Sequence, residues 1–142
     1  MKSIEIPAEK AKLSEAVGFV LGFAEELGFD KKELFQLKLC TEEIFVNVAS
    51  YAYEPDTGMI TVNADGSKDP LTVTVSFIDS GTPFDPLAKP DPAKKRPLSQ
   101  AKKGGLGIFI TKKLMDEVSY AYQDGRNILT IRKSHPVNGE QP

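Results

Sequence analysis

The sequence has 142 residues, of which 40% are hydrophobic and 27% are charged, and its formal net charge is −2. This size and balance are typical of one soluble domain with its own core, and they argue against non-specific binding to nucleic acid or to a membrane surface. Cys40 and His135 are the single cysteine and the single histidine, so we expect neither an internal disulfide nor the clustered Cys and His ligands of a zinc site.

The first predicted elements are a short strand and a helix. Residues 3–7 have the pattern of a strand, and the N-terminal end lacks the apolar run of a signal segment, so we expect a cytoplasmic protein. Pro7 suits the start of a helix. Apolar residues between 13 and 27 recur with helical spacing, and Gly28 stands where the C-cap of that helix is expected.

A second helix is predicted to begin near Asp30, because Asp30 and Glu33 have the spacing of a capping box. Its helical spacing places Leu34, Leu37, Thr41, Ile44, Val48 and Tyr51 on one stripe. Pro55 is expected to end any continuation of this helix.

The middle of the chain changes from a helical to a strand period. Residues 58–64 and 71–78 alternate between apolar and polar side chains, and Asp65-Gly66 is a hairpin turn signal between them. Residues 80–103 are rich in proline, lysine and arginine and have no apolar periodicity. A loop of this length inside a compact domain is usually functional.

The last third returns to regular structure. Residues 105–116 have a helical pattern, and two strands over 117–123 and 126–133 flank Asp124-Gly125, another hairpin signal. Residues 134–142 have the character of a frayed tail.

This element order predicts an α+β fold, a two-layer sandwich in which helices cover one face of a mostly antiparallel, mixed sheet. We expect a single domain over residues 1–134, with the loop 80–103 acting as a lid, and a flexible tail over 135–142.

The first candidate site motif lies on the second helix, where Gln36, Cys40, Glu43 and Asn47 share a face. Glu43 and Asn47 are one turn apart, and a carboxylate beside a carboxamide suits a magnesium ion held together with water and phosphate oxygens. A solvated helix face has the same pattern, so this pair alone does not establish a site.

The second motif is Asp79-Ser80-Gly81 at the end of an apolar strand. A carboxylate there can accept a hydrogen bond from an exocyclic amine such as that of adenine. Gly81 would let the backbone approach a planar ligand closely. The alternative is an ordinary turn that ends the strand, in which the same residue types are favoured.

The third motif is Gly104-Gly105-Leu106-Gly107 at the start of a helix, directly after Lys103. Free amides at a helix N-terminus bind anions, and glycines allow a phosphate to approach them. The stretch is neither a Walker loop, which needs a following Gly-Lys-Ser/Thr, nor a dinucleotide fingerprint, because Ile110 stands where a third glycine would be required. The alternative is a helix cap with tight packing.

Each motif has an ordinary structural explanation, but their order along the chain favours a nucleotide site. A metal pair, a base acceptor and a phosphate loop follow one another, and the basic loop between the last two fits a lid over phosphates.

In this order and spacing the motifs resemble the Bergerat-type ATP-binding fold of histidine kinases and related ATPases. The nearest likeness is to the stand-alone anti-sigma-factor serine/threonine kinases of bacteria. The first box of that family resembles residues 41–47, with Glu43 matching the catalytic base and Asn47 the magnesium ligand. The second box resembles residues 79–83, with Asp79 matching the adenine-binding aspartate, and the third resembles residues 104–109.

The resemblance implies that the chain binds Mg-ATP and phosphorylates an anti-sigma-factor antagonist, sequesters a sigma factor, or does both. It also allows a homodimer. A non-catalytic, ATP-gated protein-binding module is the main alternative, and slow ATP hydrolysis coupled to a conformational change is a third. Lys103, together with the lid cations Lys94, Lys95 and Arg96, is a candidate for contacting the γ-phosphate.

Three departures from the family pattern are visible. Pro83 stands in place of a second glycine, Tyr51 in place of a histidine, and Lys103 in place of an arginine. Lysine keeps the charge but lacks the bidentate fork of arginine.

Overall fold

The computed structural model describes residues 1–53, 56–88 and 105–136, with the backbone alone described for residues 88 and 105–107. Its main elements are β1 (Lys2–Pro7), α1 (Leu13–Leu27), α2 (Lys31–Asn47), β2 (Met59–Lys68), β3 (Leu71–Asp79), α4 (Gly105–Leu114), β4 (Glu117–Gln123) and β5 (Arg126–Ser134). Short helical turns are η1 (Lys10–Lys12), η2 (Val48–Ala52) and η3 (Pro86–Ala88).

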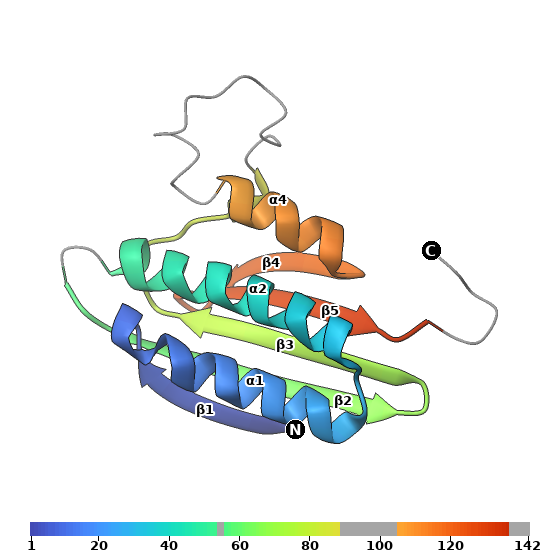
Figure 1. Ribbon diagram of the computed structural model, residues 1–142. Coiled ribbons are helices and arrows are strands. Elements are labelled where there is room, and N and C mark those ends of the chain that lie inside the picture. Colours follow the sequence, from blue (N-terminus) through green and yellow to red (C-terminus); the bar gives the residue numbers. More distant parts are fainter. Residues whose placement is uncertain (54–55, 89–104, 137–142) are drawn as a thin grey trace.

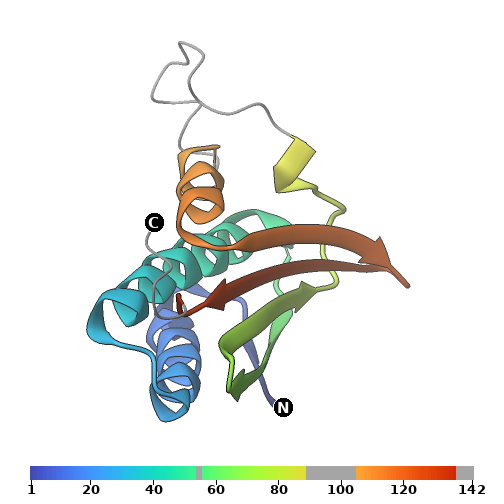
Figure 2. The same cartoon turned by 90° about the vertical axis from the view of Figure 1, so that its right-hand side faces the viewer.

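The fold has two layers, as the sequence predicts. The strands form one sheet in the order β1-β2-β3-β5-β4, and every neighbouring pair is antiparallel, so the expected mixed character is not found among the described strands. The helices lie on one face of this sheet, and the other face carries none of the described helices (Figures 1 and 2).

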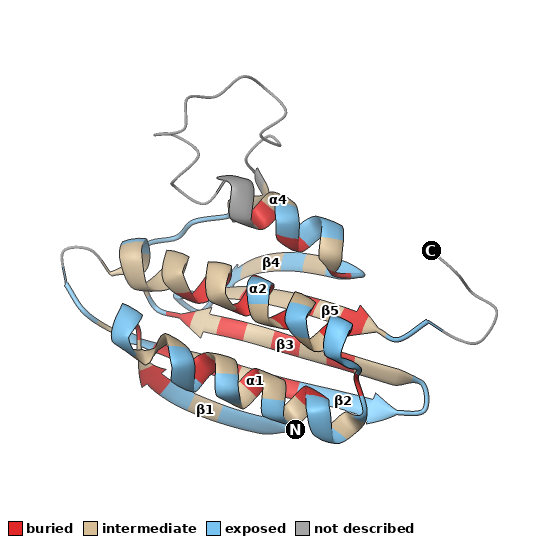
Figure 3. Ribbon diagram, in the orientation of Figure 1, coloured by how far each residue is buried: buried red, intermediate tan, exposed pale blue. Residues whose placement is uncertain are grey.

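The core forms where the two layers meet. On β3 the side chains of Val73, Val75 and Phe77 are buried, whereas Thr72, Thr74 and Ser76 on the opposite face are only partly covered. This alternation follows from the period of two along a strand, and Figure 3 shows the buried residues along the central strands and the facing sides of the helices. The predicted pattern of β3 is therefore confirmed.

The first helix begins later than predicted. Pro7 does not open a helix but ends β1, where it pairs with Met59 of β2. The ladder extends that far because Ile6 is buried against the helices, and a proline at the end of an edge strand costs no ladder hydrogen bond. The chain then forms the turn η1, and α1 runs from Leu13 to Leu27. Gly28 caps it with a left-handed φ of 117°, as predicted.

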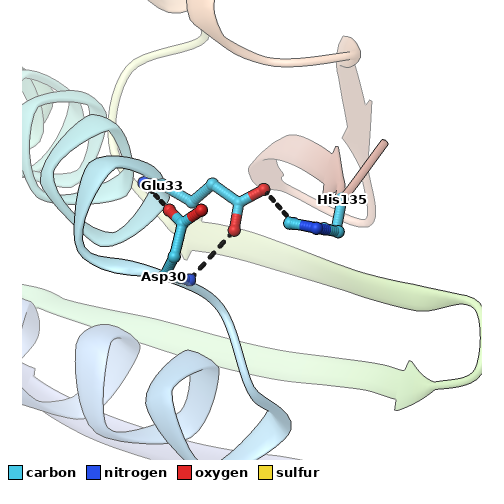
Figure 4. Close-up of side chains that lie close together, drawn as sticks. All are labelled: Asp30, Glu33 and His135. Atoms are coloured by element: carbon cyan, nitrogen blue, oxygen red, sulfur yellow. Dashed lines mark hydrogen bonds and ion pairs between the residues drawn. The ribbon is translucent and has the colours of Figure 1, made fainter. Parts of the chain in front are cut away.

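The capping box at the start of α2 is confirmed. Oδ1 of Asp30 accepts a hydrogen bond from the Glu33 amide at 2.8 Å, and Oε1 of Glu33 accepts one from the Asp30 amide at 3.0 Å. The sequence did not indicate a third participant: Nδ1 of His135 lies 2.6 Å from Oε2 of the buried Glu33 (Figure 4). One ligand atom from each of the three side chains lies within 4.8 Å of the others. The contact between His135 and Glu33 links the start of α2 to the residue that follows β5.

The β2–β3 hairpin turns later than predicted. Asp65 and Gly66 are not the turn but pair with Thr74 and Val73, and the chain reverses at Asp69–Pro70. Gly66 is required in the strand for a different reason, because a Cβ there would lie 2.3 Å from the carbonyl oxygen of Thr72.

The last hairpin and the chain end are also defined. Asp124 and Gly125 both have positive φ, 54° and 76°, which confirms the predicted tight turn between β4 and β5. β5 extends to Ser134, and the amide of His135 donates to the Leu71 carbonyl at 2.9 Å. Ordered contacts thus continue into the predicted tail, and residues 137–142 lie outside the described residues.

Candidate functional site

A cavity of about 290 Å³ opens between α2, α4 and the adjoining ends of β3, β4 and β5. Its walls are mainly apolar, and a few polar side chains converge on it. Residues from every one of these elements contribute to the lining: Glu43, Ile44, Asn47, Val48, Phe77, Asp79, Ile108, Thr111, Tyr120, Asn127 and Leu129. An apolar cavity with few convergent polar groups is the usual form of a small-molecule site.

Glu43 and Asn47 line this cavity from α2. Both side chains are half-buried, and they lie one turn apart at the end of the helix, where the chain continues into the wider turn η2. Cys40, which the sequence places on the same face, is fully buried instead. The carboxylate and the carboxamide are the kinds of oxygen ligand that a magnesium ion takes together with water and phosphate.

Cys40 belongs to the contact between α2 and α4. Burial raises the pKa of its thiol above the ordinary value, and a hydrogen bond with Thr111 opposes that rise. A protonated, buried thiol is a poor nucleophile, so Cys40 has a packing role.

Asp79 lies at the end of β3 with 6% of its surface exposed. Its Oδ1 accepts a hydrogen bond from the Gly81 amide at 2.9 Å and another from Nδ2 of Asn127 at 2.9 Å. Both bonds that the described residues make with this carboxylate fall on Oδ1, which leaves Oδ2 as an acceptor for a ligand in the cavity.

Gly81 packs against the chain itself. A Cβ at this position would lie 2.1 Å from the carbonyl oxygen of Ala52 in η2, and the neighbouring Thr82 amide donates to that same oxygen at 2.8 Å. The lack of a side chain therefore lets the loop after β3 sit directly on η2. The predicted close approach of this backbone to a planar ligand stays a prediction.

The third motif is only partly described. Gly105, Leu106 and Gly107 form the first turn of α4, while Lys103, Gly104 and the lid cations Lys94, Lys95 and Arg96 lie outside the described residues. Further along α4, Ile108 and Thr111 line the cavity, so the helix that begins with the glycines flanks the same space as Glu43 and Asp79.

The far end of α4 is fixed by the sheet. Nζ of Lys133, a nearly buried residue of β5, donates to the Leu114 carbonyl at 3.1 Å. A cation at the last carbonyls of a helix is favourable, and this contact holds α4 in place relative to β5.

Asn127 is a site residue that the motif search missed. It is buried on β5, and its Nδ2 donates to Oδ1 of Asp79 at 2.9 Å and to the Thr82 carbonyl at 3.0 Å. Its Oδ1 accepts from the Phe84 amide at 3.1 Å and from the hydroxyl of Tyr120. The strand period was the available signal, because it places Asn127 on the same face as the apolar Leu129 and Ile131.

Tyr120 keeps its proton in this environment. Partial burial raises the pKa of its hydroxyl, the nearby Asp85 and Asp79 carboxylates and Tyr122 raise it further, and a hydrogen bond from the Phe84 amide opposes them. The hydroxyl therefore acts as a donor to Asn127 at neutral pH.

Among the described helices, none combines the length and the apolar composition that crossing a membrane requires.

A comparison with protein-family models matches residues 6–133 to the histidine kinase-like ATPase domain. Among curated proteins, the chain is similar to the serine-protein kinase RsbW of Bacillus cereus, with 26% identity over 133 residues that cover 91% of this chain and 82% of that protein. The RsbW kinase of Listeria monocytogenes serotype 4a is 29% identical over 135 residues, covering 92% of this chain and 85% of that protein. The matched range runs from β1 to β5 and includes the whole described cavity.

Proposed function

Because the chain belongs to the histidine kinase-like ATPase domain family, we propose that it binds Mg-ATP and transfers the γ-phosphoryl group to a serine or threonine of a partner protein. The observation that carries this proposal is the convergence of Glu43, Asn47 and Asp79 on one largely apolar cavity. The similarity to enzymes named as serine-protein kinases supports a protein hydroxyl as the acceptor.

Asp79 is proposed to recognise the base. Its Oδ2 is free to accept a hydrogen bond from an exocyclic amine, while the apolar walls formed by Ile44, Val48 and Ile108 suit a flat ring. This combination selects a purine that carries an amine over one that carries a carbonyl oxygen at the same position.

Asn47 is proposed to hold the magnesium ion, and the carboxamide beside the Glu43 carboxylate fits the oxygen ligands that this ion prefers. The ion would neutralise phosphate charge when bound. The amides of Gly105 and Gly107 at the first turn of α4 would hold phosphate oxygens, because amides at a helix N-terminus have no partner within the helix. Lys103 would add positive charge next to them.

Glu43 is proposed to act as the general base. Phosphoryl transfer depends mainly on positioning and charge neutralisation, so the only proton-transfer group it needs is one carboxylate that accepts the proton of the incoming hydroxyl. The resemblance to the anti-sigma-factor kinases implies that the acceptor is an anti-sigma-factor antagonist in the cytoplasm and that a sigma factor is a second binding partner.

Incubation of the purified protein with Mg-ATP and an anti-sigma-factor antagonist from the same genome tests the proposal. Mass spectrometry should find phosphoserine or phosphothreonine on the antagonist, and none when magnesium is chelated. ATP binding without transfer to any candidate would contradict the kinase claim and leave an ATP-gated binding module. Failure to bind ATP would contradict the whole proposal.

A further inference from the structure

Asn127 uses both ends of its side-chain amide. Nδ2 faces the Asp79 carboxylate and the carbonyls of Thr82 and, more distantly, Gly81, and Oδ1 faces two donors, the Phe84 amide and the Tyr120 hydroxyl. A flipped amide would set oxygen against oxygen and N–H against N–H, so these partners fix its orientation. The residue is 7% exposed, so water cannot easily replace a lost partner.

This arrangement determines how Asp79 is presented to a ligand. Two donors on Oδ1, from Asn127 and Gly81, hold the carboxylate in one orientation. With Oδ1 occupied by these donors, the carboxylate presents its second oxygen, Oδ2, in a fixed position. A fixed acceptor distinguishes an amine from a carbonyl oxygen on the base.

The same amide also anchors the loop after β3. Its bonds to Thr82 and Phe84 tie that loop to β5, while Gly81 and Thr82 pack on η2. One side chain thus links the base acceptor to the backbone that lines the end of the cavity.

We propose that Asn127 is a positioning residue that sets the base selectivity of the nucleotide site by fixing the orientation of the Asp79 carboxylate, with Tyr120 acting through Asn127. This inference rests on the proposed function, since it presumes that the cavity binds a nucleotide. It assigns a role to a residue outside the three motifs.

The first test compares ATP with inosine triphosphate, which carries a carbonyl oxygen in place of the exocyclic amine. The wild-type protein should prefer ATP. In Asn127→Leu, the Asp79 carboxylate loses the hydrogen bond from Nδ2 and can rotate, so the ratio of the two Kd values should fall about tenfold. A residue with a merely structural role would lower both affinities together and leave the ratio unchanged.

The second test uses pH. Asn127→Asp places a second carboxylate against Asp79, and two carboxylates in contact share one proton. Among the described residues, the titratable and charged groups near this position are Tyr120, Asp85, Tyr122 and, on the α2 wall, Glu43, together with Tyr53 and Arg126, which line a neighbouring pocket with Asp79. Relative to wild type, the ATP affinity of Asn127→Asp should fall as pH rises and recover as pH falls, because the introduced carboxyl group, once protonated, can again donate to Asp79. Asn127→Leu should show no recovery.

A milder pair of variants covers the case in which substitution of a buried residue prevents folding. Tyr120→Phe removes only the hydroxyl that donates to Asn127 and should weaken ATP binding about threefold. Tyr122→Phe on the same strand, where Tyr122 is exposed, is the matched control and should bind like wild type.

The results separate the two proposals. If the Asn127 variants and Tyr120→Phe keep ATP selectivity and affinity within twofold of wild type, the positioning role of Asn127 is overturned while nucleotide binding stands. A wild-type protein that binds ATP without transferring phosphate would refute the kinase step but not this role. A wild-type protein that binds neither nucleotide would overturn both.

Discussion

Replacement of Asp79 by asparagine tests how the cavity recognises its ligand, because the change keeps the shape of the side chain and alters only its hydrogen bonding. In the present structure Oδ1 accepts from Gly81 and Asn127, and no described residue donates to Oδ2. The amide oxygen of Asp79→Asn should take the place of Oδ1, because the alternative sets N–H groups against two buried donors. Its NH₂ group then occupies the position of Oδ2.

The expected loss follows from that geometry. The ligand amine would meet a donor instead of an acceptor, and a buried polar group left without its partner costs about 1–3 kcal/mol. This corresponds to about a 5- to 150-fold increase in the Kd for ATP. The free energy of unfolding should change much less, since the bonds to Gly81 and Asn127 survive.

Isothermal titration with ATP and urea unfolding of the same preparation measure the two quantities. Asp85→Asn is the matched control, because Asp85 is exposed, does not line the cavity, and has an Oδ1 that accepts from the local Leu87 amide at 2.9 Å. Asp79→Asn that binds ATP as tightly as wild type would refute the assignment of Asp79 as base acceptor. A large loss of stability with unchanged affinity per folded molecule would refute it as well.

Three further predictions concern stability. Gly66→Ala should lower the free energy of unfolding by about 1–3 kcal/mol, because its Cβ would meet the Thr72 backbone. Gly22→Ala in α1 should raise it by about 0.5–1 kcal/mol, because the space around Gly22 is open and alanine favours a helix. Urea midpoints check both variants. Burial raises the pKa of the Cys40 thiol, so this thiol ionises at lower pH in the unfolded chain than in the folded one. The stability that the protonated thiol contributes is therefore present below its ordinary pKa and is lost as pH rises above it. Cys40→Ala should flatten the decline in the free energy of unfolding near pH 9, and iodoacetamide should label the native thiol slowly. His135→Ala should lower the free energy of unfolding by about 1 kcal/mol, since it removes the partner of Oε2 of the buried Glu33. An unchanged urea midpoint would show that the contact between His135 and Glu33 contributes nothing to stability.

Local signals predicted much of the fold. The capping box at Asp30 and Glu33, the C-cap at Gly28 and the Asp124-Gly125 turn each depend on contacts within a few residues, and the structure has all three. The strands were predictable for the same reason, because buried and exposed side chains alternate along a strand that has one covered face.

The errors arose where distant contacts decide the local structure. Asp65-Gly66 has the composition of a turn, but the pairing of Ile60 and Val62 with β3 keeps the chain extended past it. Pro7 likewise stays in a strand because Ile6 is held by the core. In both cases burial outweighs a local preference.

The candidate site was predictable as a set of motifs but not as a network. Glu43, Asn47 and Asp79 were found because each belongs to a recognisable box, and they line one cavity. Asn127 belongs to no box, and its partner Asp79 is 48 positions away. Only the strand register brings the two side chains together, through the pairing of Asp79 with Asn127 between β3 and β5.

The central claim is that Glu43 serves catalysis, and the direct measurement compares Glu43→Gln with Glu42→Gln. Glu42 adjoins Glu43 on α2 but forms an ion pair with Lys38 at 3.0 Å and does not line the cavity. Glu43→Gln should bind ATP within about twofold of wild type and transfer phosphate to the antagonist about 10²- to 10⁴-fold more slowly, while Glu42→Gln should match wild type in both. Transfer by Glu43→Gln at the wild-type rate would contradict the account.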